Sequence, residues 1–60
     1  MKLLKILRQE KGLTQQELAN IVNTTRSNIS GIERGTSSPS VSLAKKMASV
    51  FNVNWTIFFT

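Results

Sequence analysis

The 60-residue sequence contains no cysteine, no histidine and no aspartate. Without cysteine no disulfide can form, and without cysteine or histidine the usual zinc ligands are missing. The acidic residues Glu10, Glu17 and Glu33 are far apart along the chain, and no glycine-rich loop of the kind that cradles phosphate groups is present. We therefore expect no catalytic residues, no metal site and no cofactor, and we expect that the protein is not an enzyme.

Long hydrophobic runs are missing as well, because Arg8, Gln9 and Glu10 interrupt the apolar start of the chain. We therefore expect neither a transmembrane helix nor a signal peptide, and the lack of cysteine suits a cytoplasmic protein. A chain this short buries only about 60% of the surface that its unfolded form exposes. We expect one domain over residues 1–60, with no linker, no internal repeat and no second domain.

Positive charge exceeds negative charge. Eight lysines and arginines stand against three glutamates, which gives a formal net charge of +5. After Glu33 every charge is positive, on Arg34, Lys45 and Lys46. So large an excess on a small protein favours a polyanionic partner, such as a nucleic acid or an anionic membrane surface.

Capping signals predict two helices in the first part of the chain. Gly12 ends a first amphipathic helix. Thr14, with Glu17 three residues later, forms a capping-box pattern that opens a second helix over residues 15–22. Asn23 tolerates a positive φ angle, so it can end the second helix in a tight turn.

Two more helices follow. Thr25 can cap a third helix over residues 26–34, which Gly35 ends. Ser40 can cap a fourth helix over residues 41–51, whose apolar residues recur at helical spacing. These residues are Val41, Ala44, Met47, Ala48 and Phe51.

The last segment, residues 52–60, has two readings. Four of its hydrophobic residues alternate as in a strand and are of types that favour strands: Val53, Trp55, Ile57 and Phe59. Asn54, however, can cap a short helix in which Trp55, Phe58 and Phe59 share a face. The residue types alone slightly favour the strand.

One face of the third helix is polar, short and basic. At 100° per residue, an arc of about 140° is built only from arginine, serine and glycine. Its members are Arg26, Ser27, Ser30, Gly31 and Arg34. Such a face suits a helix that sits deep in the major groove of DNA, with Gly31 permitting the close approach and Arg26 reaching a guanine edge. The alternative is a surface helix held only by Ile29 and Ile32.

The segment "LTQQELANIVNTTRSNISGIERG", residues 13–35, resembles the helix-turn-helix of the phage-repressor and Cro family, also called the Xre-like regulators. Arg8 before "EKGLTQ", Ala19, Ile29, "IERG" and "SPS" fall at the spacings of that family. The resemblance implies an all-α, compact five-helix, lambda-repressor-like domain, whose helix-turn-helix unit covers about residues 15–34 and whose tail is a fifth helix. It also implies a sequence-specific transcriptional regulator of bacterial or phage origin that binds double-stranded DNA.

The resemblance also implies roles for single residues. Arg26 and Ser27 match base-reading positions of the family, and we expect Ser30, on the same polar face, to read bases as well. Gln15, Thr25 and Arg34 match positions that contact the DNA backbone, and we expect Asn28 to contact it as well. Arg8 and Glu33 match a partly buried ion pair that ties the first helix to the third.

The sequence departs from the family pattern at three places. Asn23 replaces the usual glycine of the turn, and Gly31 stands where a base-reading side chain is frequent. The loop "GTSSPS" lacks the lysine or arginine that often contacts phosphates there.

A single recognition helix touches only a few base pairs, so we expect a homodimer on a palindromic operator with half-sites about 34 Å apart. All four aromatic residues lie within residues 51–59, and so small a core has room for only some of them. We expect Trp55 or Phe59 to stay partly exposed and to form the dimer contact.

Two other functions stay open. The fold can serve mainly as a protein-interaction module, as a coactivator- or antitoxin-like partner, although such a module has no need of a basic face with Arg26 and Arg34. The segment "MKLLKILRQ" is cationic with an apolar face, as in helices that bind membrane surfaces. We favour a place in the core for Leu4 and Leu7, and hence no membrane partner.

Overall fold

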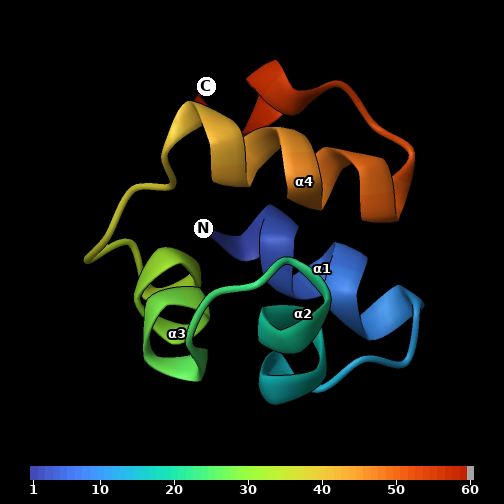
Figure 1. Ribbon diagram of the computed structural model, residues 1–60, viewed down its shortest axis with the longest axis vertical. Coiled ribbons are helices and arrows are strands. Elements are labelled where there is room, and N and C mark those ends of the chain that lie inside the picture. Colours follow the sequence, from blue (N-terminus) through green and yellow to red (C-terminus); the bar gives the residue numbers. More distant parts are fainter. Residues whose placement is uncertain (60) are drawn as a thin grey trace.

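The computed structural model describes residues 1–59, and all regular structure in that range is helical. Its elements are α1 (Lys2–Glu10), α2 (Gln15–Ile21), α3 (Arg26–Arg34), α4 (Val41–Phe51) and a 3-10 helix, η1 (Trp55–Phe59). Figure 1 shows α1 running between α4 on one side and the pair of α2 and α3 on the other. The all-α class is confirmed, and the fifth helix is of the 3-10 type.

The preference of the residue types for a strand in the tail was wrong. Asn54 Oδ1 accepts hydrogen bonds from the backbone N–H of Thr56 at 3.0 Å and from its hydroxyl at 2.9 Å, which opens η1. Residues 1–59 contain no strand with which an extended tail could pair, so a strand there would lack the ladder hydrogen bonds of a sheet. Packing also breaks the alternation, because Phe58 is buried and Phe59 is exposed.

The capping signals are confirmed. Thr14 and Glu17 form both bonds of the capping box, at 3.0 and 2.8 Å. The hydroxyls of Thr25 and Ser40 each accept a hydrogen bond of 3.1 Å from the backbone N–H three residues later. Asn23 has a φ angle of 59°, and α2 ends at Ile21, one residue before the expected end. Local hydrogen bonds thus fix where these helices begin and end.

The core takes side chains from every helix. Leu4 is fully buried and Leu7 is half-buried, so the apolar face of α1 packs against the rest of the protein. Val41, which was expected on the inner face of α4, is 50% exposed, because it lies at the edge of that face, and Leu43 is buried instead. No helix within residues 1–59 is long and apolar enough to cross a membrane.

Candidate nucleic-acid interface

Residues 22–25 form the turn between α2 and α3. Thr24 N–H donates to Ala19 O at 2.8 Å, so the chain reverses closely against the end of α2. Asn28 Nδ2 donates to Thr24 Oγ1 at 3.0 Å, which ties the first turn of α3 to the loop before it. Ala19 is fully buried, and its small side chain suits this close packing. These bonds fix α3 relative to α2.

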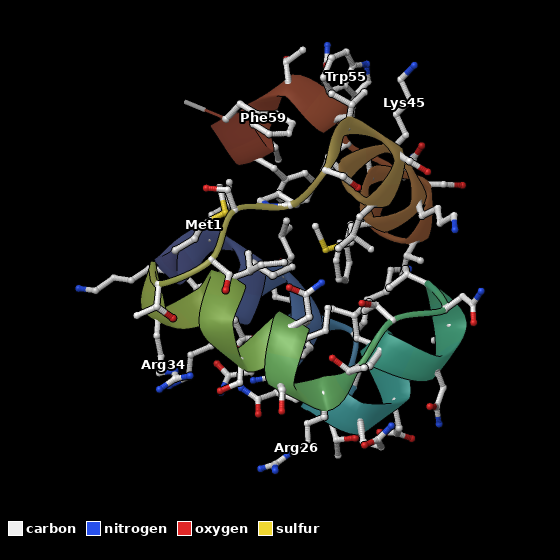
Figure 2. The ribbon with its side chains drawn as sticks, turned by 60° about the vertical axis from the view of Figure 1, so that its left-hand side comes forward. Met1, Arg26, Arg34, Lys45, Trp55 and Phe59 are labelled. Carbon is white, nitrogen blue, oxygen red and sulfur yellow. The ribbon has the colours of Figure 1, made fainter. Side chains whose placement is uncertain are left out.

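The outer side of α3 carries two arginines. Arg26 and Ser27 are exposed at the start of the helix, and Arg34 is exposed at its end, where its Nε donates to Ser30 O at 3.4 Å. Neither arginine forms an ion pair with an acidic residue in the described part of the chain. Figure 2 shows both side chains extending away from the body of the protein. Both charges are therefore available to an anionic partner.

Three other residues of this region are partly engaged. The Thr25 hydroxyl accepts the capping bond from Asn28 N–H, and its own O–H can still donate. Asn28 and Ser30 are half-buried, and the Asn28 amide uses one N–H on Thr24. Of the residues proposed to contact DNA between 25 and 34, Asn28 and Ser30 are thus half-buried, and the others are exposed.

The reason for Gly31 differs from the one expected. Gly31 is buried against the loop that follows α3, and an added Cβ atom would lie 2.7 Å from Ser37 Oγ and 3.2 Å from Ser37 Cβ. Its carbonyl accepts hydrogen bonds from Thr36 N–H at 2.9 Å and from Ser37 N–H at 3.1 Å. The segment that closely approaches Gly31 in this structure is therefore the protein's own loop.

Behind the exposed side of α3, the ion pair between Arg8 and Glu33 joins α1 to the last turn of α3. Arg8 Nε donates to Glu33 Oε2 at 2.7 Å and Arg8 Nη2 donates to Oε1 at 3.2 Å. Arg8 Nη1 also donates to Leu13 O at 2.7 Å. Only 10% of the Arg8 side chain and 5% of the Glu33 side chain are exposed, so the pair is more deeply buried than expected.

Gln15, the first residue of α2, joins this pair, because its Nε2 donates to Glu33 Oε1 at 3.1 Å. Burial alone would raise the pKa of Glu33, but the hydrogen bonds from Arg8 and Gln15 and the charge of Arg8 outweigh it, so the pKa is lowered. The hydrogen bond to Glu33 likewise raises the pKa of Arg8 despite burial. The carboxylate is therefore ionised in the folded protein at neutral pH.

Trp55 and Phe59 lie at the other end of the molecule from Arg26 (Figure 2). Their rings meet edge to face with centroids 6.0 Å apart, and Lys45 Nζ lies 5.3 Å from the centroid of the Trp55 ring. Phe51 and Phe58 are buried, whereas Trp55 is half-buried and Phe59 is 47% exposed. The expectation that these two aromatics stay partly exposed is confirmed.

Besides the hydrogen bond from Gln15 to Glu33, sequence reasoning missed three further contacts. Lys45 packs over Trp55, and Ser37 packs against Gly31. The N-terminal ammonium of Met1 donates to the carbonyls of Ile32 and Glu33 at the end of α3. No local pattern in the sequence signals any of them. Within residues 1–59, no three potential metal ligands among His, Cys, Asp and Glu lie together.

Comparison with known proteins gives several relatives. YqaF of Bacillus subtilis, named an uncharacterized HTH-type transcriptional regulator, is 45% identical over 58 residues, which cover 97% of this chain and 76% of YqaF. The competence pilus inhibition repressor of Acinetobacter baylyi is 40% identical over 48 residues, or 80% of this chain and 44% of that protein. An uncharacterized HTH-type transcriptional regulator of Methanothermobacter thermautotrophicus is 51% identical over 41 residues, or 68% of this chain and 59% of the relative.

The match to a family model covers nearly the whole chain. The model, described as helix-turn-helix, matches residues 4–58. This range includes every helix except the first residues of α1 and the last residue of η1. In agreement with the resemblance to phage repressors and Cro, the chain belongs to the helix-turn-helix family.

Proposed function

We propose that this protein is a transcriptional regulator that binds double-stranded DNA by placing α3 in the major groove. Its family and the relatives named as transcriptional regulators and as a repressor support this function. The observation that carries the proposal is the outer side of α3, where Arg26, Ser27 and Arg34 are exposed and both arginines lack an acidic partner within residues 1–59. A groove about 12 Å wide admits a helix with such a face.

The proposed DNA-binding residues divide into those that read bases and those that contact the DNA backbone. Bases would be read by Arg26, Ser27 and Ser30, with the planar guanidinium of Arg26 donating two hydrogen bonds to one guanine. The residues that would contact the DNA backbone are Gln15, Thr25, Asn28 and Arg34. Contacts to phosphates set the register and carry no sequence information. Loss of a backbone contact therefore lowers affinity for all sequences, whereas loss of a base contact also lowers sequence preference.

We further propose that two copies bind a palindromic operator. Half-sites one helical turn apart place the two copies about 34 Å apart, whereas the Cα trace of one copy measures only 23 × 23 × 20 Å. Two copies then meet only through projecting side chains, for which Trp55 and Phe59 are the candidates. So small a contact predicts weak dimerisation without DNA and cooperative binding with it. Such a regulator would act in the cytoplasm, where it meets its operator.

Two matched substitutions test the proposal. Arg26→Ala is expected to cost about 1–3 kcal/mol at the preferred site and to relax the preference at one base position. Arg34→Ala removes the same charge from the same helix but is expected to weaken binding to all sequences alike. The preferred DNA site is first found by selection among random duplexes. The affinities of the parent and both variants are then measured at one salt concentration. If Arg26→Ala changes neither affinity nor preference, α3 does not read the bases as proposed.

A protein-interaction module on the same fold is the second candidate, because Lys45, Trp55 and Phe59 form a cationic and aromatic surface away from α3. Salt dependence separates the two functions. A DNA-binding protein loses affinity with a slope of about −0.9 in log affinity against log salt for each phosphate it neutralises. A flat dependence would favour the interaction module.

A further inference from the structure

Glu33 lies where α1, α2 and α3 meet. Its Oε2 accepts a hydrogen bond from Arg8, and its Oε1 accepts hydrogen bonds from both Arg8, at 3.2 Å, and Gln15, at 3.1 Å. The Glu33 side chain is 5% exposed, whereas Gln15 is half-buried at the start of α2. A buried carboxylate therefore holds a side chain that reaches the surface beside α3.

The chemistry of the two groups fixes how Gln15 is held. An ionised carboxylate only accepts hydrogen bonds, so the Nε2 end of the amide must face Glu33 and the Oε1 end cannot. The Gln15 side chain makes no other hydrogen bond within residues 1–59, so its second N–H stays available. A DNA phosphate also only accepts hydrogen bonds, and an amide whose orientation is already fixed loses less entropy on meeting one.

On the basis of the proposed function, we propose that Glu33 is a positioning residue for DNA binding, which orders the Gln15 amide for a hydrogen bond to one phosphate. Arg8 holds Glu33 in place by two hydrogen bonds. The buried ion pair thus acts on affinity as well as on the packing of α1 against α3. Ordering one glutamine side chain in advance corresponds to about two- to tenfold in affinity.

A double-mutant cycle on DNA affinity tests this role. Gln15→Met removes the amide and keeps the length of the side chain, and Glu33→Gln removes the charge and keeps the shape. The two single variants, the double variant and the parent are compared at a temperature where circular dichroism shows all four to be folded. We expect Gln15→Met to weaken binding by about two- to tenfold in the parent and by less than about twofold in the Glu33→Gln background. The same fold-change in both backgrounds overturns the proposal.

The position of the phosphate whose contact is lost gives a second readout. A purely structural role of Glu33 would not remove the contact to one particular phosphate. Ethylation of the phosphate that Gln15 contacts is expected to weaken DNA binding by the parent. The same ethylation is expected to have no effect on binding by Gln15→Met or by Glu33→Gln. Arg34→Ala, the matched control, is expected to lose a different phosphate. If Glu33→Gln weakens the contact at all phosphates evenly, Glu33 serves stability alone.

A measurement on the unaltered protein covers the case in which Glu33→Gln does not fold. The side-chain amide of Gln15 is expected to have an NMR order parameter that approaches the value of rigid backbone, about 0.85, whereas the exposed amide of Gln9 is expected below about 0.6. A Gln15 amide as mobile as that of Gln9 overturns the proposal. If the amide is rigid but the parent binds no DNA, the proposed function itself has failed, and the phosphate contact with it.

Discussion

Substitution of Arg8 by alanine would leave the Glu33 carboxylate, 5% exposed, with Gln15 as its remaining hydrogen-bond donor. Breaking a buried ion pair from one side costs about 3–5 kcal/mol, because the other charge stays buried without compensation. A 60-residue domain has a total free energy of unfolding of about 3–9 kcal/mol, at 0.05–0.15 kcal/mol per residue. We therefore expect Arg8→Ala to remove most of the stability and to leave the protein partly unfolded at room temperature.

The opposite substitution is expected to cost less. In Glu33→Ala, Arg8 keeps its 2.7 Å hydrogen bond to Leu13 O, and its long side chain can move its charge toward water. We expect a loss of about 2 kcal/mol for Glu33→Ala. In the double variant no buried charge is left alone, so its loss should be smaller than the sum of the two single losses by about 1–3 kcal/mol.

Urea unfolding followed by far-UV circular dichroism at low temperature measures the free energies of unfolding of the parent, the two single variants and the double variant. A low temperature keeps a folded baseline for Arg8→Ala. Losses that add to within about 0.5 kcal/mol would refute the reasoning, because they would mean that the two side chains do not depend on each other.

Three further predictions concern stability and use the same assay. Gly31→Ala should not give the gain of about 1 kcal/mol expected from helix propensity, because its Cβ meets Ser37, and adding Ser37→Ala should restore part of that gain; a rise with Gly31→Ala alone would contradict this. Thr25→Ala should cost about 1 kcal/mol by removing the cap of α3, whereas Thr25→Ser should cost little; equal losses would show that the hydroxyl is not the cause. The lowered pKa of Glu33 stabilises the protein above the ordinary value of 4.5, and this contribution is lost as the pH falls through the lower folded value. The parent should therefore lose more stability than Glu33→Gln on acidification, and parallel pH curves would be the contrary result.

The features that sequence reasoning predicted are local ones. The caps at Thr14, Thr25 and Ser40 each need only a hydroxyl and a backbone N–H three residues later, so the sequence contains both partners side by side. The turn at Asn23 likewise depends on the freedom of one residue. These signals placed four helices to within about one residue at most ends.

The features that it missed depend on how helices meet. The tail has the composition of a strand, and the lack of a pairing strand within residues 1–59, the burial of Phe58 and the cap at Asn54 decide against it. Gly31 was assigned to the surface, because a helical wheel does not show where the next loop returns. The ion pair of Arg8 with Glu33 was suggested by the family resemblance alone, and the bond from Gln15 to the same carboxylate was not foreseen.

The predicted contacts and the missed ones together explain how a 60-residue protein keeps a helix as polar as α3. Ile29 and Ile32 bury one side of it, Thr25 caps its start, and the Met1 ammonium binds carbonyls at its end. Glu33 anchors the last turn to α1 through Arg8. The stability of α3 therefore comes from its inner side and its two ends.

The outer side of α3 makes few of the contacts that stabilise the fold. Arg26 and Ser27 are exposed and make no side-chain hydrogen bond within residues 1–59, so their chemistry can change without loss of the fold. The Arg34 side chain makes one hydrogen bond within residues 1–59, a long one of 3.4 Å from its Nε to Ser30 O. A helix held from behind and at its ends can present side chains that are chosen for a partner and not for helix propensity. This separation of support from contact is the physical reason why a helix of poor intrinsic propensity can serve as the candidate recognition element.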